Sequence, residues 1–587
     1  MPRVSSWKTR KDEILAVLRI LNRPTIYKLT IFCSLGILLN LFDLVGIFLF
    51  ATFASGVANL VQGNSSNTRL ENFLSDLTQF QFSTNTFLSM VAGTMLAALI
   101  IKTVASALLN RKVITFLSAK ETEFALQTFK KYQSLKGEDF YGRTAEEFYY
   151  SVSISASRIF NGVIYPLTQL LAEIFLLLLV FSLLLVVSPA ITTLATLFLA
   201  GSVFWIGRFA HHGTSIASKL IVKSSLKIQE IVRHTFEGYK ELKNLQNWDL
   251  IDNNFETARA DFSINQAKMI WYQQLPRYSL EAVVIISAAA LTIYEVSNSD
   301  IRTALVKLSI YMITIFRILP SFQKIQSASL AITSGLIASR LSRDILSLKE
   351  DIELGNGGIC NQPSNPIIAK ISVSKISYHY PNSNNSTLSD LSFNIPGNRL
   401  IGLSGPSGIG KSTLLDILTG IRSPTTGSVR FLNSQNQELK PSIAYVPQRP
   451  FLLNDSILAN VTLRLNNSNE NIKKAKELFT VFFGHESIGQ FNKKLSLDSN
   501  IEMGANSLSG GQLQRIAIMR ALFTDADLIV LDECFSGLEL KITKEIFQEL
   551  RRKSLESSII IVTHSKSILR LCDNTFNLSA KKMREYK

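Results

Sequence analysis

A long apolar run in the first third of the chain constrains the fold more than any other feature. The run covers residues 161–187, and its centre, Ile174–Val187, consists almost entirely of Leu, Val, Ile and Phe. A helix needs about 20 consecutive apolar residues to cross a bilayer. The run therefore predicts a transmembrane helix and argues against a wholly soluble enzyme.

Five further apolar segments in the first half bring the predicted number of transmembrane helices to six. Charged residues make up 18% of the chain, below the roughly 25% of soluble domains. Basic and mixed stretches, 111–160 and 208–278, separate some of the segments and are expected to be helical extensions in the cytosol. The other five segments lie near residues 29–56, 87–110, 190–207, 281–296 and 304–325.

The distribution of Lys and Arg predicts the orientation in the membrane. Residues 1–23 carry six basic side chains, whereas the polar loop 62–86 carries Arg69 alone. Because cytoplasmic segments are enriched in Lys and Arg, both termini are expected on the cytosolic side of the cytoplasmic (inner) membrane. No cleavable signal peptide is expected, because the first apolar run is long and no small-residue cleavage site follows it.

The net charge of +16 is assigned to contact with the membrane surface. Nucleic acid is not expected as a partner, because no basic cluster is interleaved with aromatic residues. Residues 7–22 alternate basic with apolar side chains, which predicts an amphipathic helix at the headgroups; an ordinary solvated helix is the alternative. The four cysteines, at positions 33, 360, 534 and 572, lack metal-ligand spacing and are expected to be free thiols.

The chain is predicted to divide into an α-helical membrane domain of six spans and an α/β P-loop ATPase domain. The second half alternates short β-rich runs with helical patterns, and the stretch 351–366, rich in Gly, Asn and Pro, is typical of a linker. The predicted limits are 1–25 for the N-terminal helix, 26–340 for the transmembrane domain, 341–366 for the linker and 367–587 for the ATPase domain.

The second half of the chain contains a complete phosphate-binding loop. It fits G-x-x-x-x-G-K-[ST], follows an apolar strand at 400–403 and precedes a helix at 413–418. Backbone N–H groups and the helix N-terminus would bind the phosphates of ATP, Lys411 would reach the β- and γ-phosphates, and Ser412 would bind Mg²⁺. The loop residues are Gly405, Pro406, Ser407, Gly408, Ile409, Gly410, Lys411, Ser412 and Thr413.

Two carboxylates follow a second apolar strand. Residues 528–531 read Leu-Ile-Val-Leu and precede Asp532 and Glu533. Asp532 is expected to hold Mg²⁺, and Glu533 to act as the base toward the attacking water. A solvated acidic pair at the end of a strand is the alternative when the strand is taken by itself.

The sequence Leu508-Ser509-Gly510-Gly511-Gln512 lies between these two motifs. The order of phosphate loop, LSGGQ and LIVLDE resembles the nucleotide-binding domain of ABC transporters. The resemblance implies that Ser509, Gly510, Gly511 and Gln512 bind ATP held by a second domain. One copy of each motif per chain then implies a dimer, most simply a homodimer.

Three single residues match smaller motifs of that family. Tyr380 resembles the aromatic residue that stacks on adenine, Gln448 the glutamine that contacts Mg²⁺ and water, and His564 the histidine that contacts the γ-phosphate. Two positions depart from the family pattern: Glu539 stands where Asp is usual, and Met503 stands where an acidic residue is usual.

The first half resembles the membrane part of exporter-type half-transporters. It is similar, more narrowly, to the lipid-linked oligosaccharide flippases of bacterial protein glycosylation around Arg277 and Arg317. The two cytosolic turns near 138–148 and 236–246 are then expected to dock on nucleotide-binding domains.

The two arginines suggest a substrate site. Charged residues within spans are costly unless they face a cavity or a partner, and guanidinium groups bind phosphate oxygens in a forked geometry. Arg277 and Arg317 are therefore candidate contacts for a pyrophosphate head group. Pairing with Glu173, Asp43 or Glu281 is the alternative, and Lys102 is expected to extend its ammonium toward the membrane interface.

The predicted function is ATP-driven export or flipping of an amphiphile. The preferred cargo is a polyprenyl-pyrophosphate-linked oligosaccharide, and membrane lipid is the other expected partner. Exporters of lipid, drug or peptide remain open, as does an ATP-gated channel or regulator that hydrolyses little ATP. The expected cofactors are ATP and Mg²⁺.

Overall fold

The computed structural model separates into two compact units, which are described here one at a time. The helical unit comprises Met1–Leu135 and Gly142–Glu350, and the sheet unit comprises Lys136–Tyr141 and Asp351–Lys587. The residues described are 7–61, 84–135, 137–187, 189–298, 301–348, 367–380, 386–463, 468–484, 495–501, 508–579 and 582–586.

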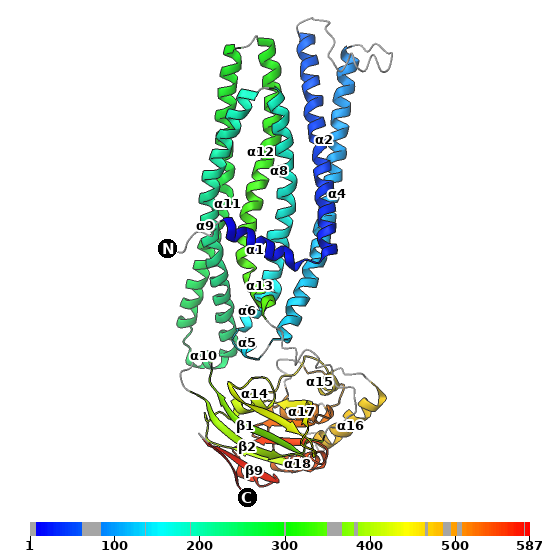
Figure 1. Cartoon of the computed structure of the whole chain (residues 1–587), viewed down its shortest axis with the longest axis vertical. Coiled ribbons are helices and arrows are strands. Elements are labelled where there is room, and N and C mark those ends of the chain that lie inside the picture. Colours follow the sequence, from blue (N-terminus) through cyan, green and yellow to red (C-terminus); the bar gives the residue numbers. More distant parts are fainter. Residues whose placement is uncertain are drawn as a thin grey trace. The chain divides into compact units, whose positions relative to one another are not determined.

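Among the residues that the structure describes, six long helices build the helical unit (Figure 1). Each predicted apolar segment falls on a different one of them, and a separate short helix, α1 (Trp7–Ile20), precedes them. Helix α2 packs along α4, α8 along α12, and α9 along α11. The long helices are α2 (Arg23–Val61), α4 (Thr84–Gln133), α8 (Tyr165–Val187), α9 (Pro189–Glu237), α11 (Asp249–Asn298) and α12 (Ile301–Ala338).

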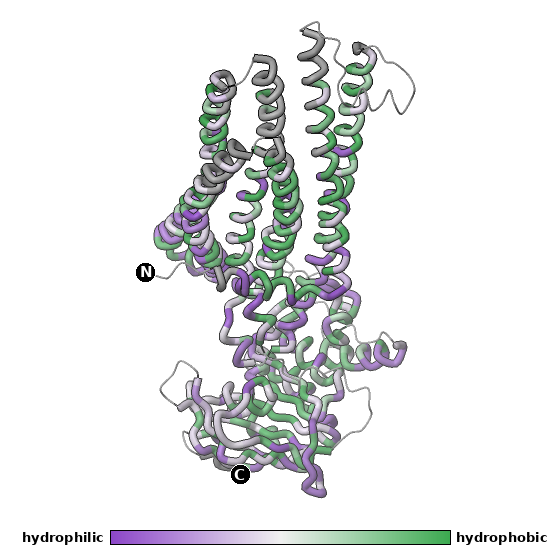
Figure 2. Tube along the Cα trace, turned by 45° about the horizontal axis from the view of Figure 1, so that its top comes forward, coloured by the Kyte–Doolittle hydropathy of each residue, from purple (hydrophilic) through white to green (hydrophobic). Residues whose placement is uncertain are grey.

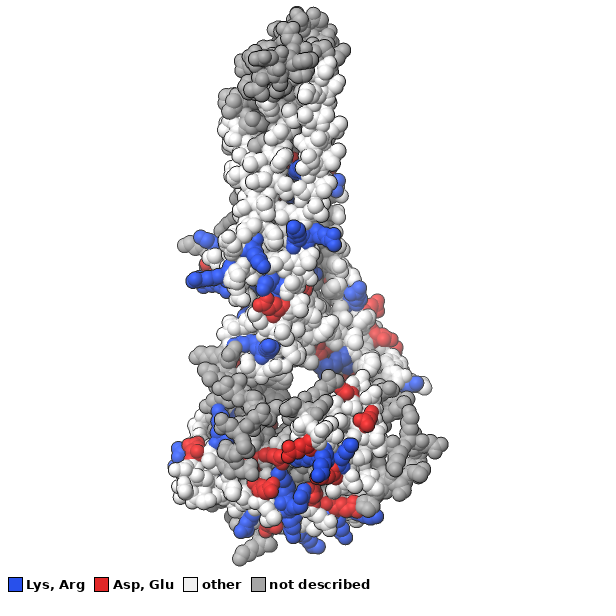
Figure 3. Space-filling model, turned by 90° about the vertical axis from the view of Figure 1, so that its right-hand side faces the viewer, with Lys and Arg blue, Asp and Glu red and all other residues white. Residues whose placement is uncertain are grey.

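Length and composition mark four helical stretches of the described residues as able to cross a membrane. Figure 2 shows that apolar residues dominate long parts of the helices. Figure 3 shows one face of the helical unit, on which charged side chains are few in the upper, white part and gather below it. The other two predicted spans lie on α9 and α12, where many side chains are outside the described residues. The four stretches are Arg23–Phe50, Thr86–Gln133, Ala145–Ser182 and Asp249–Tyr294.

Shorter elements lie between the long helices or follow the last of them. The third predicted span is not α-helical at its start, because residues 160–164 form a π-helical segment. These elements are α6 (Ala145–Tyr149), η1 (Tyr150–Ser155), α7 (Ala156–Ile159), η2 (Phe160–Ile164), α10 (Tyr239–Leu245) and α13 (Arg340–Ser347).

Two glycines allow η2 to pack closely on α12. A Cβ atom on Gly335 would lie 2.7 Å from the carbonyl carbon of Gly162 and 2.8 Å from its oxygen. These neighbours are backbone atoms, which a side-chain rotation cannot move away. Phe160 and Val163 are buried in the surrounding core, so this contact fixes the spacing of the two elements.

The described part of the sheet unit forms two sheets. The first is antiparallel, in the order β2-β1-β4-β5. The second has the order β10-β9-β3-β8-β7-β6 and is parallel except for β10. The strands are β1 (Lys370–Tyr378), β2 (Leu388–Pro396), β3 (Leu400–Ser404), β4 (Thr426–Leu432), β5 (Glu438–Leu439), β6 (Ile443–Val446), β7 (Leu528–Asp532), β8 (Ser558–Val562), β9 (Asn574–Ser579) and β10 (Lys582–Tyr586).

Apolar side chains cover both faces of the parallel sheet. Strands β3, β7 and β8 are buried along nearly their whole length, as is usual for parallel strands flanked by helices. Two buried clusters, one including Ile516 and Leu531 and the other including Leu414 and Val530, form the core. The helices are α5 (Gly137–Tyr141), α14 (Lys411–Leu418), α15 (Ile457–Thr462), α16 (Asn469–Phe483), α17 (Gly510–Phe523), α18 (Leu540–Lys553) and α19 (Lys566–Leu569).

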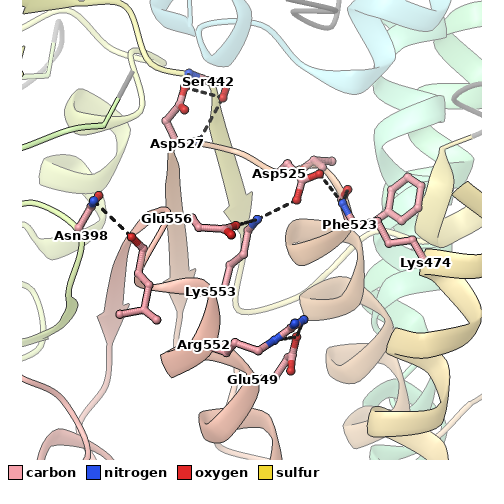
Figure 4. Close-up of polar contacts among 12 residues, drawn as sticks. Asn398, Ser442, Lys474, Phe523, Asp525, Asp527, Glu549, Arg552, Lys553 and Glu556 are labelled. Carbon is pink, nitrogen blue, oxygen red and sulfur yellow. Dashed lines mark hydrogen bonds and ion pairs between the residues drawn. The ribbon is translucent and has the colours of Figure 1, made fainter. Parts of the chain in front are cut away.

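A carboxylate between two lysines ties three elements of this unit together (Figure 4). Asp525, in the turn between α17 and β7, accepts a 2.8 Å hydrogen bond from Lys553 of α18 and pairs with Lys474 of α16. Lys474 also donates to the carbonyl of Phe523 at 2.9 Å. Burial by itself would raise the pKa of Asp525, but the hydrogen bonds from both lysines outweigh burial and hold this pKa below its ordinary value.

We expect Gly335→Ala to destabilise the helical unit. The added methyl group would push η2 away from α12, and such overpacking costs about 1–3 kcal/mol. Gly93→Ala is the matched control, because a Cβ there meets nothing within 4 Å and alanine favours a helix over glycine. Thermal unfolding of the purified proteins should therefore show a lower Tm for Gly335→Ala and an equal or higher Tm for Gly93→Ala. Equal Tm values for both variants would contradict the prediction.

We expect Asp525→Asn to lower the Tm of the sheet unit at pH 7. A carboxyl whose folded pKa is depressed contributes stability above its ordinary pKa of about 4, and this contribution disappears as the pH falls through the folded value. The difference in Tm between wild type and variant should therefore shrink below about pH 4. Glu556→Gln is the control, because Glu556 contacts Lys553 from an exposed position. An equal decrease in Tm in both variants would contradict a stabilising role for the pairing of Asp525 with the two lysines.

Candidate active site

The phosphate loop connects β3 to α14. Gly408 has a φ of 77° and Gly410 a φ of 102°, a left-handed backbone that glycine adopts without strain. Gly410 is the N-cap of α14 and has no side chain to occupy the first N–H groups of the helix. The loop thus presents N–H groups and the positive end of a helix dipole to an anion.

The side chains of the loop differ in how open they are. Lys411 is buried, and its Nζ donates to the carbonyl oxygens of Gly405 at 2.8 Å and Pro406 at 3.0 Å. Ser412 is exposed, whereas Thr413 is buried. The bonds from Lys411 hold the loop in a closed ring, and its ammonium lies at the centre of the loop. Pro406, Ser407 and Gly408 are exposed, and Ile409 packs on the core.

The predicted catalytic residues meet at the carboxyl end of β7. Gln448 donates from Nε2 to Oε2 of Glu533 at 2.9 Å, and His564 Nε2 lies 3.2 Å from Oε1 of Glu533. Glu533 has a φ of 50°, which is uncommon for a residue with a side chain. Its N–H donates to the carbonyl of Val562 at 3.0 Å, so the turn away from β7 is held by β8.

Asp532 has a partner that the motifs did not indicate. The hydroxyl of Tyr445, on β6, donates to its Oδ2 at 3.1 Å. Burial raises the pKa of Asp532, the bond from Tyr445 opposes this, and the charge of Glu533 raises it further. The pKa of Tyr445 is likewise raised, by burial and by the charge of Asp532. The phenol therefore stays protonated and keeps this carboxylate oriented.

The oxygen donors suit Mg²⁺ in type. Ser412 offers a hydroxyl, Gln448 an amide and Asp532 a carboxylate, and Mg²⁺ is usually held by one or two carboxylates together with substrate phosphates. The described residues contain no group of three or more His, Cys, Asp and Glu side chains that could hold a metal by themselves. A metal at this site would accordingly share its coordination with a bound nucleotide.

The LSGGQ segment forms the start of α17. Ser509 caps the helix by accepting from the N–H of Gln512, and the Gln512 side chain accepts from the N–H of Ser509. A Cβ on Gly511 would lie 2.9 Å from the carbonyl oxygen of Gly537, so glycine lets this turn approach the loop after Glu533.

A groove of about 680 Å³ lies beside this turn. Its lining combines Ser509, Gly510 and Gly511 with the exposed Glu539, and the phosphate loop does not contribute to it. Glu539 is also the N-cap of α18, without a side-chain bond to that helix. The other departure from the family pattern, Met503, lies outside the described residues.

Tyr380 belongs to a group of aromatic rings around Arg422. The Tyr380 hydroxyl lies 3.1 Å from Oγ1 of Thr413, and the Arg422 guanidinium lies 5.0 Å from the Tyr380 ring and 5.0 Å from the Tyr141 ring of α5. Arg422 is fixed by Asp416 at 2.8 Å. The motifs did not indicate Arg422, whose sole sequence signal is a positive charge in the turn after α14.

Several charged residues of the helical unit form ion pairs within it. Arg277 bonds Glu281 at 2.9 Å on an exposed face of α11, which corresponds to the pairing alternative for this arginine. The prediction for Lys102 was wrong, because its ammonium bonds both oxygens of Asp43, at 2.7 and 2.9 Å, instead of extending to the interface. For a charged ammonium within a membrane span, pairing with a nearby buried carboxylate is less costly than remaining unpaired. The side chain of Arg317 lies outside the described residues.

Known proteins resemble the chain in both units. The ABC transporter family model matches residues 388–536. The lactococcin G processing and transport ATP-binding protein of Lactococcus lactis subsp. lactis is 28% identical over 364 residues, which are 60% of this chain and 50% of that protein. The ATP-dependent lipid A-core flippase of Wigglesworthia glossinidia brevipalpis is 24% identical over 385 residues, 63% of each chain. The matches thus cover between half and just under two thirds of these relatives.

A solved structure covers nearly the whole chain. A bacterial Atm1-family ABC exporter with ATP bound superposes with a TM-score of 0.77 at 16% identity, over 96% of this chain and 95% of that one. This similarity confirms the predicted fold class, a helical transmembrane region joined to an α/β P-loop domain.

We expect Tyr445→Phe to weaken the use of Mg²⁺. The substitution removes the donor that orients Asp532, and loss of such a supporting bond typically costs 10- to 100-fold in metal affinity or activity. The Mg²⁺ concentration for half-maximal ATP hydrolysis should rise at least about 10-fold. Tyr378→Phe is the control, because that hydroxyl accepts from Arg422; a similar rise in the control would refute the role of Tyr445.

Proposed function

Because this chain belongs to the ABC transporters and has their exporter-type fold, we propose that it hydrolyses ATP to export or flip an amphiphile across the cytoplasmic membrane. Both termini lie in the cytosol in this proposal, in line with the basic N-terminal segment. The proposal rests on the site around Glu533, where one carboxylate contacts both Gln448 and His564.

The arrangement supports hydrolysis by a general base. The Glu533 carboxylate accepts the proton of a water molecule as the water oxygen attacks the γ-phosphorus and the bond to the β-phosphate oxygen breaks. Gln448 and His564 hold Glu533 in place, and the N–H groups ahead of α14 bind the phosphates. Ser412, Gln448 and Asp532 would hold Mg²⁺, which would supply positive charge to neutralise the phosphates.

A second copy of the chain would complete each site. The groove beside Ser509–Gln512 is separate from the phosphate loop of the same chain, so the LSGGQ turn is available to a nucleotide held by another copy. In a homodimer that closes around two nucleotides, the phosphate loop of one copy and the LSGGQ turn of the other would contact the same nucleotide. Tyr380 then stacks on adenine beside Arg422.

The preferred cargo is a polyprenyl-pyrophosphate-linked oligosaccharide. The flippase-like segments around Arg277 and Arg317 support it, as does the similarity to a protein named as a lipid A-core flippase. Arg277 keeps an exposed side chain beside Glu281, so its guanidinium can still reach a phosphate. The second candidate is a peptide, since another relative is named for lactococcin processing and transport.

We expect Glu533→Gln to abolish ATP-driven translocation. A proton-transfer group typically contributes 10²- to 10⁴-fold to the rate, so ATP hydrolysis should fall at least about 100-fold. Proteoliposomes with purified full-length protein, Mg²⁺-ATP and a labelled polyprenyl-pyrophosphate oligosaccharide measure both activities. Glu549→Gln, which removes an acid that pairs with Arg552 away from the site, should leave both unchanged.

Two outcomes would alter the proposal in different ways. Hydrolysis without movement of the glycolipid would exclude this cargo, and a labelled peptide would be tested next. A low ATPase rate that is insensitive to Glu533→Gln would contradict the transporter mechanism and favour an ATP-gated channel or regulator.

A further inference from the structure

A cavity of about 400 Å³ lies inside the helical unit, among α2, α4, α8 and α12. We call it the four-helix cavity and define it by Phe32, Asn40, Lys102, Asn110, Glu173 and Lys324, all of which line it. Helix α2 carries both Phe32, which lines the cavity, and Asp43, which bonds the lining residue Lys102. These two residues of α2 are 11 positions apart, which corresponds to about 17 Å of helix. The volume falls within the usual range of ligand pockets, about 300–1,000 Å³.

The cavity is polar but electrically balanced. Lys102 pairs with the buried Asp43 at 2.7 Å, and Lys324 pairs with the buried Glu173 at 2.7 Å. Asn40 and Asn110 are tied to neighbouring helices through the carbonyl of Ala172 and the hydroxyl of Tyr165. Charged groups at membrane depth are costly and commonly mark substrate or ion pathways. Two pairs around one cavity therefore indicate more than helix association.

One carboxylate oxygen of Glu173, a residue that lines this cavity, lacks a hydrogen-bond partner among the residues that the structure describes. Oε1 of Glu173 accepts from Lys324, whereas Oε2 is buried and has no hydrogen-bond partner among the described residues. The Glu173 side chain is 5% exposed. A buried acceptor without a donor loses its hydrogen bonds to water without replacement, and the loss is larger when the acceptor is charged. A ligand that donates a hydrogen bond to Oε2 would recover this free energy.

The charge balance decides which donor fits best. Lys324 already neutralises Glu173, so an ammonium group at Oε2 would add an uncompensated positive charge to a site of low dielectric. A hydroxyl donates the same bond without adding charge. The lining also includes Phe32 and Leu39, which can contact an alkyl chain.

We propose that the four-helix cavity binds the hydroxyl-bearing, sugar-like head group of an amphiphile, with Glu173 as the acceptor for one hydroxyl. This site lies within a single copy of the chain. It deepens the proposed function by assigning a head-group class and a location, and it rests on that function for its role in transport. A single water molecule would satisfy Oε2 but occupies about 30 Å³, a small part of this volume.

Cys33 gives a direct reading of occupancy, because this cysteine lines the same cavity. The full-length protein would be purified in a polyoxyethylene detergent, placed in phospholipid nanodiscs and treated with N-ethylmaleimide. Peptide mass spectrometry then gives the alkylation rate of Cys33, with Cys572 of the sheet unit as the internal reference. Three probes with the same tail are compared: dodecyl glucoside, dodecylamine and dodecyl phosphate.

At a concentration where the other two probes have little effect, we expect dodecyl glucoside to slow alkylation of Cys33 at least about 5-fold, because one acceptor bond raises the affinity by roughly that factor. Glu173→Gln should weaken this protection, because a neutral amide oxygen is a weaker acceptor than a carboxylate. The matched control is Glu230→Gln, which breaks an exposed pair with Lys227 on α9 and should keep full protection. Gly36→Val offers a second variant, since a Cβ there meets Ala172 at an ordinary 3.8 Å and its side chain would fill the cavity without removing a charge.

Several results would overturn the proposal. Equal protection by all three probes would mean non-specific partitioning, and protection by dodecylamine or dodecyl phosphate alone would assign an ammonium or anion site instead. Absence of protection by dodecyl glucoside, or full protection in both Glu173→Gln and Gly36→Val, would exclude the site. ATP hydrolysis is measured on the same preparations, so failure of the proposed function is seen separately from failure of the cavity to bind.

Discussion

The chemistry of the sheet unit depends on the parallel alignment of four neighbouring strands, β3, β8, β7 and β6. Backbone pairing sets Leu403 opposite Val562, and Val562 opposite Asp532. Because parallel strands end at one edge, the segments that follow them converge there. Residues that are more than 100 positions apart in the chain, such as Lys411 and Glu533, thus reach one region without any direct bond between them.

The backbone conformation at Glu533 gives its carboxylate a direction different from that of Asp532. Asp532 continues the line of β7, whereas the left-handed conformation of Glu533 turns the chain at once. Such a conformation costs of order 1–3 kcal/mol and persists where surrounding structure enforces it. The buried Cys534 and the bond from Glu533 N–H to Val562 supply that enforcement. Two successive acids consequently take different partners, Tyr445 for one and Gln448 with His564 for the other.

The sequence predicted features that depend on local pattern. The glycines of the phosphate loop, the apolar strand before Asp532 and the apolar segments on six separate long helices could be read directly, because each is encoded within a few turns of chain. The ATP-site roles assigned to Tyr380 and His564 stay predictions. The π-helical segment Phe160–Ile164 escaped prediction, since α- and π-helical turns have the same apolar composition.

Contacts between distant residues could not be predicted in this way. Lys102 and Asp43 are 59 positions apart, and Lys324 and Glu173 are 151 apart; which cation meets which acid depends on how the helices pack. Tyr445 was visible in the motif around Gln448, but its hydroxyl gains a role only when β6 is placed beside β7.

Arg422 shows how a single such contact can connect parts of the sheet unit. Its guanidinium is equally close to Tyr380, the proposed adenine contact, and to Tyr141 of α5. Gly137, at the start of α5, packs so tightly that a Cβ there would overlap the carbonyl of Ile421, the residue before Arg422. The turn after α14 therefore cannot shift without moving α5 as well. Since α14 begins at the phosphate loop, a nucleotide that repositions this helix would act on α5 through backbone packing and one arginine, and no hinge is required between them.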